Sequence, residues 1–115
     1  VMADVHVKHG SHSIVADRSL AEQTRDNVFY DADMLIATGN RTGDATPLSE
    51  VKGIKDYTDL PVLVGSGLTA DNATELLPHI DGAIVGSWIK KDGVWWNEVD
   101  YDRAARLMDI VSKYR

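Results

Sequence analysis

The sequence contains no cysteine in its 115 residues, which excludes disulfide bonds and metal sites built on thiolates. It also lacks an excess of basic residues, because 12 lysines and arginines stand against 18 acidic residues. A net charge of −6 argues against a protein that binds nucleic-acid phosphates, since such proteins carry a basic patch. No apolar run approaches the roughly 18 residues of a membrane span, and no leader-like segment opens the chain. We therefore expect a cytoplasmic protein without membrane insertion.

Apolar residues make up 43% of the chain, enough to form a hydrophobic core. Four apolar runs alternate with four segments of helical pattern. Runs of this kind, apolar throughout, are typical of parallel strands covered by helices. The pattern predicts an α/β fold of four consecutive βα units within one domain, residues 1–115. The predicted strands and helices are, in order, 3–7, 17–30, 32–40, 47–58, 61–67, 69–80, 82–88 and 99–115.

Local signals mark where three of these helices begin. Thr69 is predicted as the N-cap of the third helix, and Asp100 as the N-cap of the last. Pro47 is predicted at the start of the second helix, where the N–H group that proline lacks would have no partner within the helix. In the last helix, apolar residues recur at helical spacing and form one buried stripe. That stripe comprises Ala104, Leu107, Met108 and Val111.

The first strand has two different faces. Val5 and Val7 point to one side, whereas Asp4, His6 and Lys8 point to the other, because successive side chains alternate across a strand. A strand covered by helices on both faces would be apolar on both. A polar inner face instead suits the interior of a barrel near its open end, where side chains meet a ligand.

The last two predicted strands both end in glycine and serine. Gly65, Ser66 and Gly67 follow the third strand, and Gly86 and Ser87 follow the fourth. Glycine lets the backbone approach a ligand closely, and the amides at the start of a following helix favour an anion. In many (β/α)8 barrels the loops after strands seven and eight bind phosphate beside a short extra helix. We predict such a phosphate site here; the alternative is two tight turns with small residues for packing.

The segment "KHGSH", residues 8–12, supplies candidate catalytic groups. Lys8 can act as a base, an acid or a Schiff-base nucleophile in a closed site, and His9 titrates near neutral pH. The alternatives are an exposed polar loop, or a metal site formed by His6, His9 and His12. We predict Asp4, His6, Lys8 and His9 as the catalytic residues, with no metal ion and no cofactor.

The glycine-rich loop after the second strand is the other candidate for phosphate contact. Thr38 would point inward and Arg41 could hold an anion, with Gly39 and Asn40 between them. The alternative is a flexible loop with an exposed arginine. Further along, Trp95 and Trp96 stand in a loop before the last helix, where we expect them to cover the barrel rim or an oligomer contact.

Taken together, these segments resemble the BtpA/SgcQ family of TIM barrels. The resemblance rests on "DVHVKHGSHSI", "ATGNRTGDATPLSEVK", "PVLVGSGLTADN", "DGAIVGSWIKKDGVWWNEVD" and the closing R-x-x-x-L-M. It covers essentially all 115 residues in order. It implies a (β/α)8 barrel of which this segment is the C-terminal half, strands five to eight. It also implies that Asp4, His6, Lys8, His9 and the glycine loops lie at the barrel mouth.

The family resemblance leaves more than one function open. One branch is associated with stabilising photosystem I in cyanobacteria, which implies a non-enzymatic assembly or biogenesis factor as one alternative. Other members occur near sugar-metabolism genes. Our first hypothesis is an enzyme, an isomerase or an aldolase-like lyase, that acts on a small phosphorylated metabolite. In it, Lys8 and His9 transfer protons and Asp4 tunes Lys8.

A whole barrel needs about 250 residues, so four βα units are half of one. Half a barrel leaves two unpaired sheet edges, which favour association with other strands. We therefore expect either a homo-oligomer or pairing with the missing N-terminal half. A third hypothesis is an inactive half-barrel that only self-associates.

Overall fold

The computed structural model describes residues 1–6, 17–39 and 45–115, and it confirms the predicted α/β fold class. One sheet holds the strands β1 (Met2–Asp4), β2 (Met34–Ala37), β3 (Val62–Val64) and β4 (Gly82–Ala83). The helices between and after them are α1 (Leu20–Phe29), α2 (Leu48–Lys55), α3 (Ala73–Leu76) and α4 (Tyr101–Val111). Short 3-10 turns cover Leu77–His79, Ser87–Ile89, Lys91–Gly93 and Ser112–Tyr114.

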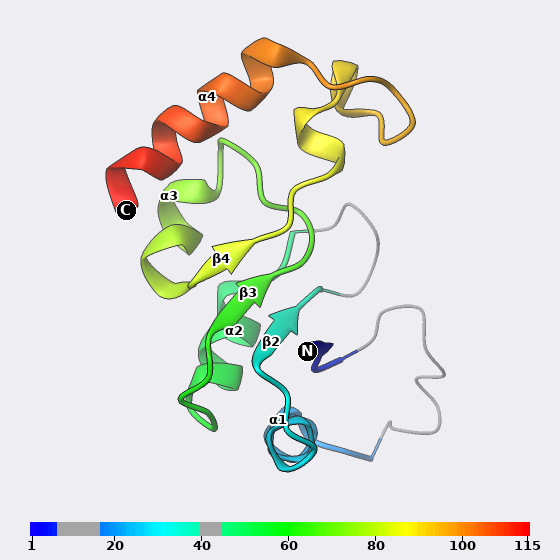
Figure 1. Cartoon of the computed structure of the whole chain (residues 1–115), viewed down its shortest axis with the longest axis vertical. Helices are drawn as coiled ribbons and strands as arrows, with labels where there is room; N and C mark the ends of the chain where they lie inside the picture. The colour runs from blue at the N-terminus through cyan, green and yellow to red at the C-terminus, as the bar shows by residue number, and fades with distance from the viewer. Residues whose placement is uncertain (7–16, 40–44) are drawn as a thin grey trace.

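The strands lie in the order β1-β2-β3-β4, and each neighbouring pair is parallel. A doubly wound sheet reverses its strand order at a switch point, whereas the wall of a βα barrel does not. The consecutive order is therefore consistent with half of a (β/α) barrel. Because neighbouring strands are parallel, all four end at the same edge of the sheet (Figure 1).

The hydrophobic core lies between one face of the sheet and the helices, which gather on that side (Figure 1). Leu35, Ala37, Val62 and Val64 are completely buried on this face. They pack in one cluster with residues of the helices and of the loop before α3. Those partners are Val51, Ile54, Leu68, Ala73, Leu76 and Leu107.

The opposite face of the sheet is partly exposed. Met2, Met34 and Ile84 keep 55%, 37% and 47% of their surface accessible, although each is apolar. The predicted alternation at the first strand is present, because Val5 is buried while Asp4 is exposed. This partly exposed face corresponds to the interior of a barrel, and we call it the inner face.

Capping groups explain where the longer helices begin. Ser19 and Glu22 form a reciprocal capping box at α1, and the carboxylate of Asp100 accepts the N–H of Arg103 at α4, as predicted. Pro47 is the residue directly before α2. The Ser19 and Asp100 caps each satisfy an amide that the helix itself leaves without a partner, whereas Pro47 makes no side-chain cap.

The prediction for the third helix was wrong by one turn. Its N-cap is Asn72 rather than Thr69, and α3 has only four residues. Thr69 instead closes a turn, because its hydroxyl accepts the N–H groups of Asp71 and Asn72 at 3.2 and 3.3 Å. The Asn72 side chain also stabilises this turn, because its oxygen accepts the Thr69 N–H at 2.8 Å.

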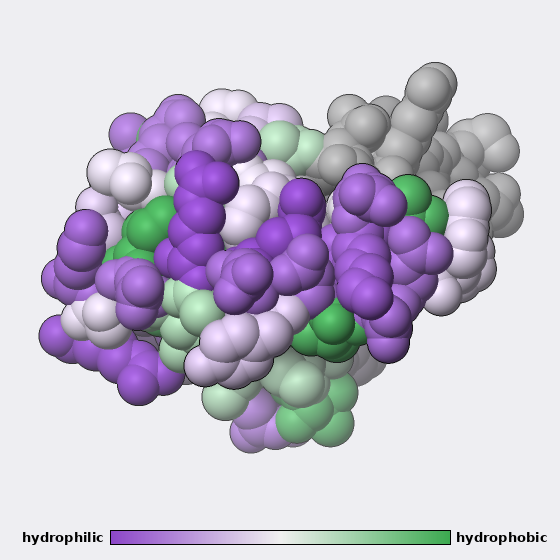
Figure 2. Space-filling view, turned by 90° about the horizontal axis from the view of Figure 1, so that it is seen from above, coloured by the Kyte–Doolittle hydropathy of each residue, from purple (hydrophilic) through white to green (hydrophobic). Residues whose placement is uncertain are grey.

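The last helix presents a mostly polar surface to solvent. Figure 2 views the molecule from the α4 end and shows a predominantly hydrophilic face with separate small hydrophobic areas. Of the predicted stripe, Leu107 is buried, Ala104 and Val111 are half-buried, and Met108 is 47% exposed. Among the described residues, none of the helices has the length and apolar character needed to cross a bilayer.

The stability of the fold should depend on Asp81 in acid. The Val62 N–H, at 2.9 Å, and then the Lys55 ammonium, at 3.2 Å, lower the pKa of this carboxyl below its ordinary value of 3.8. A lowered pKa contributes stability above pH 3.8 that is lost as the pH falls through the folded pKa. We expect Asp81→Asn, which keeps the acceptor oxygen, to reduce the unfolding free energy near neutral pH but not at pH 2. Urea unfolding between pH 2 and neutral pH measures this. If the unfolding free energies of the two proteins differed by the same amount at every pH, the prediction would be contradicted.

Candidate functional site

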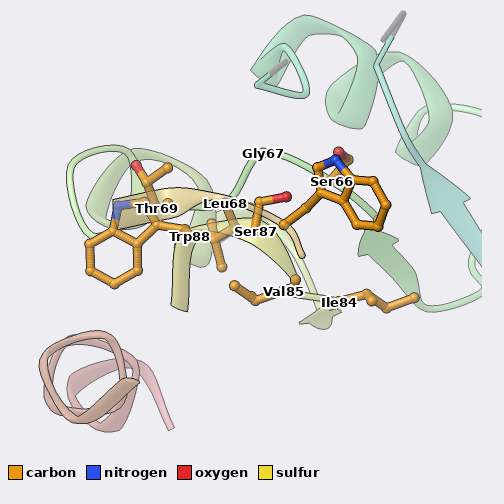
Figure 3. A pocket seen from close by; sticks show the side chains of 12 residues that line it. Ser66, Gly67, Leu68, Thr69, Ile84, Val85, Ser87 and Trp88 are labelled. Atoms are coloured by element: carbon orange, nitrogen blue, oxygen red, sulfur yellow. The ribbon is translucent and has the colours of Figure 1, made fainter. Parts of the chain in front are cut away.

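One pocket of about 490 Å³ lies at the edge of the sheet where β3 and β4 end. Its walls are the loop after β3 and the segment after β4, together with part of the loop before α4 (Figure 3). The residues that line it are Gly65, Ser66, Gly67, Leu68, Thr69, Ile84, Val85, Gly86, Ser87, Trp88, Gly93 and Trp95. The two Gly-Ser loops identified in the sequence therefore share one pocket, which we call the glycine pocket.

Gly65 is required by the close approach of β2 and β3. A Cβ atom at this position would lie 2.6 Å from the Ile36 methyl and 3.0 Å from the Thr38 methyl. Its own N–H continues the ladder by donating to the Ala37 carbonyl at 2.8 Å. Glycine at 65 thus lets the strands pair up to the point where the pocket begins.

The other two glycines of the pocket differ from each other. Gly67 has a φ of 74°, a left-handed conformation that residues with a side chain adopt at a cost. Gly86 has a negative φ, and a Cβ built on it meets no atom within 4 Å. Packing therefore does not require glycine at 86, so a side chain there can be used to fill the pocket.

Two buried or half-buried side chains fix the loop after β3. The Thr46 hydroxyl, in a residue only 2% exposed, lies 3.0 Å from the Ser66 carbonyl and 3.3 Å from the Ala37 carbonyl. The Asn72 amide donates to the Gly67 carbonyl at 2.8 Å while its oxygen accepts the Thr69 N–H. The loop is thus held in shape before any ligand arrives.

Neutral groups dominate the chemistry of the glycine pocket. Among the described residues that line it, none has a charged side chain. Within the same part of the chain, no hydrogen bond uses the backbone N–H of Gly67, Gly86 or Ser87. These donors, with the hydroxyl of Ser87, are the groups that could meet an anion.

A positive charge lies directly behind one wall of the pocket. The Arg103 guanidinium sits 4.6 Å from the centre of the Trp88 ring, and its Nε donates to the Trp88 carbonyl. The same side chain lies 3.3 Å from the place of a Cβ on Gly93. Our sequence reasoning did not include Arg103 or Trp88 in the site. The signal available was the R-x-x-x-L-M motif, in which Arg103 is the first residue.

The other predicted site residues that the structure describes do not line this pocket. Asp4, His6, Thr38 and Gly39 lie in or just after β1 and β2, at the same sheet edge. The hydroxyl of Thr38, just after β2, donates to the carbonyl of His6, just after β1, at 3.1 Å. The predicted Lys8, His9, Asn40 and Arg41 are outside the described residues. A joint site of these residues with the glycine pocket stays a prediction.

The described part of the chain holds no group of three His, Asp or Glu side chains that could bind a metal ion. The alternative histidine trio includes His9 and His12, which lie outside that part.

Comparison with known families gives a match: the sequence model of the BtpA family matches residues 1–113 of this chain. No solved structure matches the chain.

Curated relatives match along nearly the whole chain. The uncharacterized protein MJ1115 of Methanocaldococcus jannaschii is 41% identical over 115 residues, which are 100% of this chain and 43% of the relative. The uncharacterized protein F13E9.13, mitochondrial, of Caenorhabditis elegans is 38% identical over 97% of this chain and 40% of its own length. The sgc region protein SgcQ of Escherichia coli is 30% identical over 88% of this chain and 38% of its own. The chain thus spans about two fifths of these relatives.

The contrast between two glycines of the pocket can be tested by adding one methyl group to each. Gly65→Ala forces its Cβ against Ile36 and Thr38, and we expect it to lower the unfolding free energy by about 1–3 kcal/mol. Gly86→Ala, which meets open space, should change it by less than about 0.5 kcal/mol. Urea unfolding of both variants measures the difference. Equal effects would mean that strand approach at Gly65 is not a constraint.

Proposed function

The chain belongs to the BtpA family, and from that premise we propose that its glycine pocket binds the phosphate group of a small phosphorylated metabolite. One observation carries the proposal. Two loops from different βα units, each ending a strand in glycine and serine, line the same pocket. In βα barrels the corresponding loops after the last two strands are a frequent phosphate site.

The source of the attraction for phosphate is the loop backbone rather than a helix dipole. The helix α3 has four residues and starts after the loop, so its macrodipole contributes little. The N–H groups of Gly67, Gly86 and Ser87 can each donate to a phosphate oxygen. Because Thr46 and Asn72 already fix the loop after β3, binding requires little reorganisation.

For the reaction we propose acid–base chemistry at the neighbouring strand ends. Asp4 ends β1 and His6 follows it, at the edge of the sheet where the glycine pocket lies, and Lys8 and His9 come next in the sequence. A phosphate held in the pocket would anchor a carbonyl compound beside these groups. Proton abstraction and return there would give an isomerisation, or an aldol-type cleavage if Lys8 forms a Schiff base.

We further propose that the open half-barrel is completed by other strands. Within the described sheet, β1 and β4 each pair with only one neighbour, so each is an edge. When this chain is alone, a second copy related by a twofold axis would set β4 of one against β1 of the other. All eight strands would then be parallel, and the exposed apolar residues of the inner face would be buried. In a longer protein, the other half would take that place.

Phosphate binding is tested by titrating the dialysed protein with inorganic phosphate and following its melting temperature and the heat of binding. We expect a saturable signal that competes with sulfate, because the backbone donors recognise a tetrahedral anion. Gly86→Leu should abolish the signal by filling the pocket without straining the backbone. Gly67 is a poorer target, because its positive φ makes substitution a folding change.

The control is Gly82→Ala at the other end of β4, where the added Cβ makes only ordinary contact with Leu63 at 3.5 Å. This variant should bind phosphate as the parent does. If Gly86→Leu binds phosphate as well as the parent chain, the anion site lies elsewhere and the proposed function is wrong.

Association of two copies is tested by light scattering on the purified chain, whose single copy has a mass of 12.6 kDa. We expect twice that mass, and a return to one copy for Met34→Lys, which puts a charge on the inner face. The matched control is Tyr57→Lys, a position 44% exposed just after α2, the helix that connects the two central strands β2 and β3. A folded parent chain that stays a single copy at all concentrations would refute the association.

A further inference from the structure

Trp95 is the one tryptophan of an adjacent pair that lines the glycine pocket, and Trp96 does not. Both are largely exposed, at 66% and 71%. Large exposed aromatic side chains beside a pocket are frequent binding surfaces, because they offer apolar area at a small entropic cost. The difference between these neighbours therefore points to a role for Trp95 in recognition.

The loop that carries Trp95 is ordered by its own hydrogen bonds. The Lys91 N–H donates to the Glu98 carbonyl at 2.9 Å, and the Asn97 side chain donates to the Lys91 carbonyl at 2.9 Å. The Asp100 N–H closes the base by donating to the Ile89 carbonyl at 2.8 Å. An aromatic ring on such a loop is held in place before binding.

The Trp96 ring limits the position of Trp95 as well. The two rings meet edge to face, with centroids 5.4 Å apart and planes at 89°. This geometry is favourable for aromatic pairs and leaves the Trp95 ring accessible to a ligand. Trp96 thus contacts the Trp95 ring without itself lining the pocket.

The pocket is larger and more apolar than a phosphate group requires. Its volume of about 490 Å³ falls within the range of about 300–1,000 Å³ that is usual for small-molecule sites. Beyond the glycine corners, its walls are the side chains of Leu68, Ile84, Val85, Trp88 and Trp95. Figure 3 shows Ile84 and Val85 beside the loop from Gly67 to Thr69.

The hydrogen-bonding groups of these walls are few. The Thr69 hydroxyl already accepts two backbone N–H groups of its own turn. No carboxylate or amide side chain lines the pocket among the described residues. A ligand rich in hydroxyl groups would leave some of them unpaired in this space, at a cost in affinity. A flat apolar group has no hydroxyl groups to leave unpaired, so it does not incur this loss of affinity.

We propose, resting on the proposed function, that the ligand carries a planar aromatic or heteroaromatic group joined to its phosphate, and that this group stacks on Trp95. The phosphate occupies the corners at Gly67 and Gly86, and the ring lies along the apolar walls. The ligand class is therefore an aryl phosphate, of which phenyl phosphate is the simplest example.

The test compares three probes by calorimetry: inorganic phosphate, glycerol phosphate and phenyl phosphate. Stacking on a tryptophan contributes enough for phenyl phosphate to bind about tenfold more tightly than the other two. Two of the chain's three tryptophans line the pocket, so phenyl phosphate should also change the intrinsic fluorescence. Inorganic phosphate should leave that fluorescence nearly unchanged.

Variants at the two neighbouring tryptophans identify the residue responsible. Trp95→Ala should remove the advantage of phenyl phosphate while it leaves inorganic phosphate binding intact, and Trp95→Phe should keep most of it. Trp96→Ala is the matched control, similar in exposure and adjacent in sequence, and should keep at least half of the advantage.

Each possible failure has a distinct meaning. If inorganic phosphate binds and phenyl phosphate binds no better, the stacking proposal is overturned and the proposed function stands. If Trp95→Ala and Trp96→Ala weaken phenyl phosphate equally, Trp95 has no special role. If neither anion binds, both proposals fail. If Trp95→Ala instead reduces the mass in light scattering and leaves binding unchanged, the ring is an oligomer contact and the stacking proposal is again overturned.

Discussion

The close approach of β2 and β3 at their carboxyl ends is the constraint on which the rest of the structure depends. Backbone hydrogen bonds hold the two strands side by side, and Leu35, Ala37, Val62 and Val64 are completely buried between them and the helices. On the inner face the same approach leaves no room for a side chain at Gly65. The chain therefore turns at the sheet edge with no side chain covering its backbone at Gly65. The Thr46 hydroxyl holds that turn through the carbonyls of Ala37 and Ser66. The glycine pocket is a consequence of how the strands pack.

Much of this arrangement could be predicted from sequence because it depends on patterns that repeat. Continuous apolar runs between helical segments indicated parallel strands, and four units in a row indicated a consecutive sheet. Two runs that end in the same small residues indicated loops at one edge, and the structure has both loops at one pocket. Asp100 could be identified as an N-cap because capping depends on neighbours within one turn.

Other features depend on contacts between residues far apart in the sequence, which local patterns do not encode. Thr69 has the residue type of an N-cap, yet Asn72 binds both Gly67 and Thr69, so α3 starts later. Trp95 and Trp96 are indistinguishable by type, and only the path of their loop decides which one lines the pocket. The position of Arg103 over Trp88 joins residues fifteen apart through a ring and a carbonyl.

For the proposed phosphate ligand, long-range electrostatics is unfavourable, so recognition would depend on the groups of the pocket itself. The chain has a net charge of −6, so its overall field repels phosphates before contact. At physiological ionic strength that repulsion is screened beyond about 8 Å. Among the described residues, the Arg103 guanidinium lies over Trp88 in the pocket wall, and the lining itself consists of neutral amides, hydroxyls and apolar or aromatic side chains. Such groups bind through geometry, so a preorganised loop matters more here than net charge.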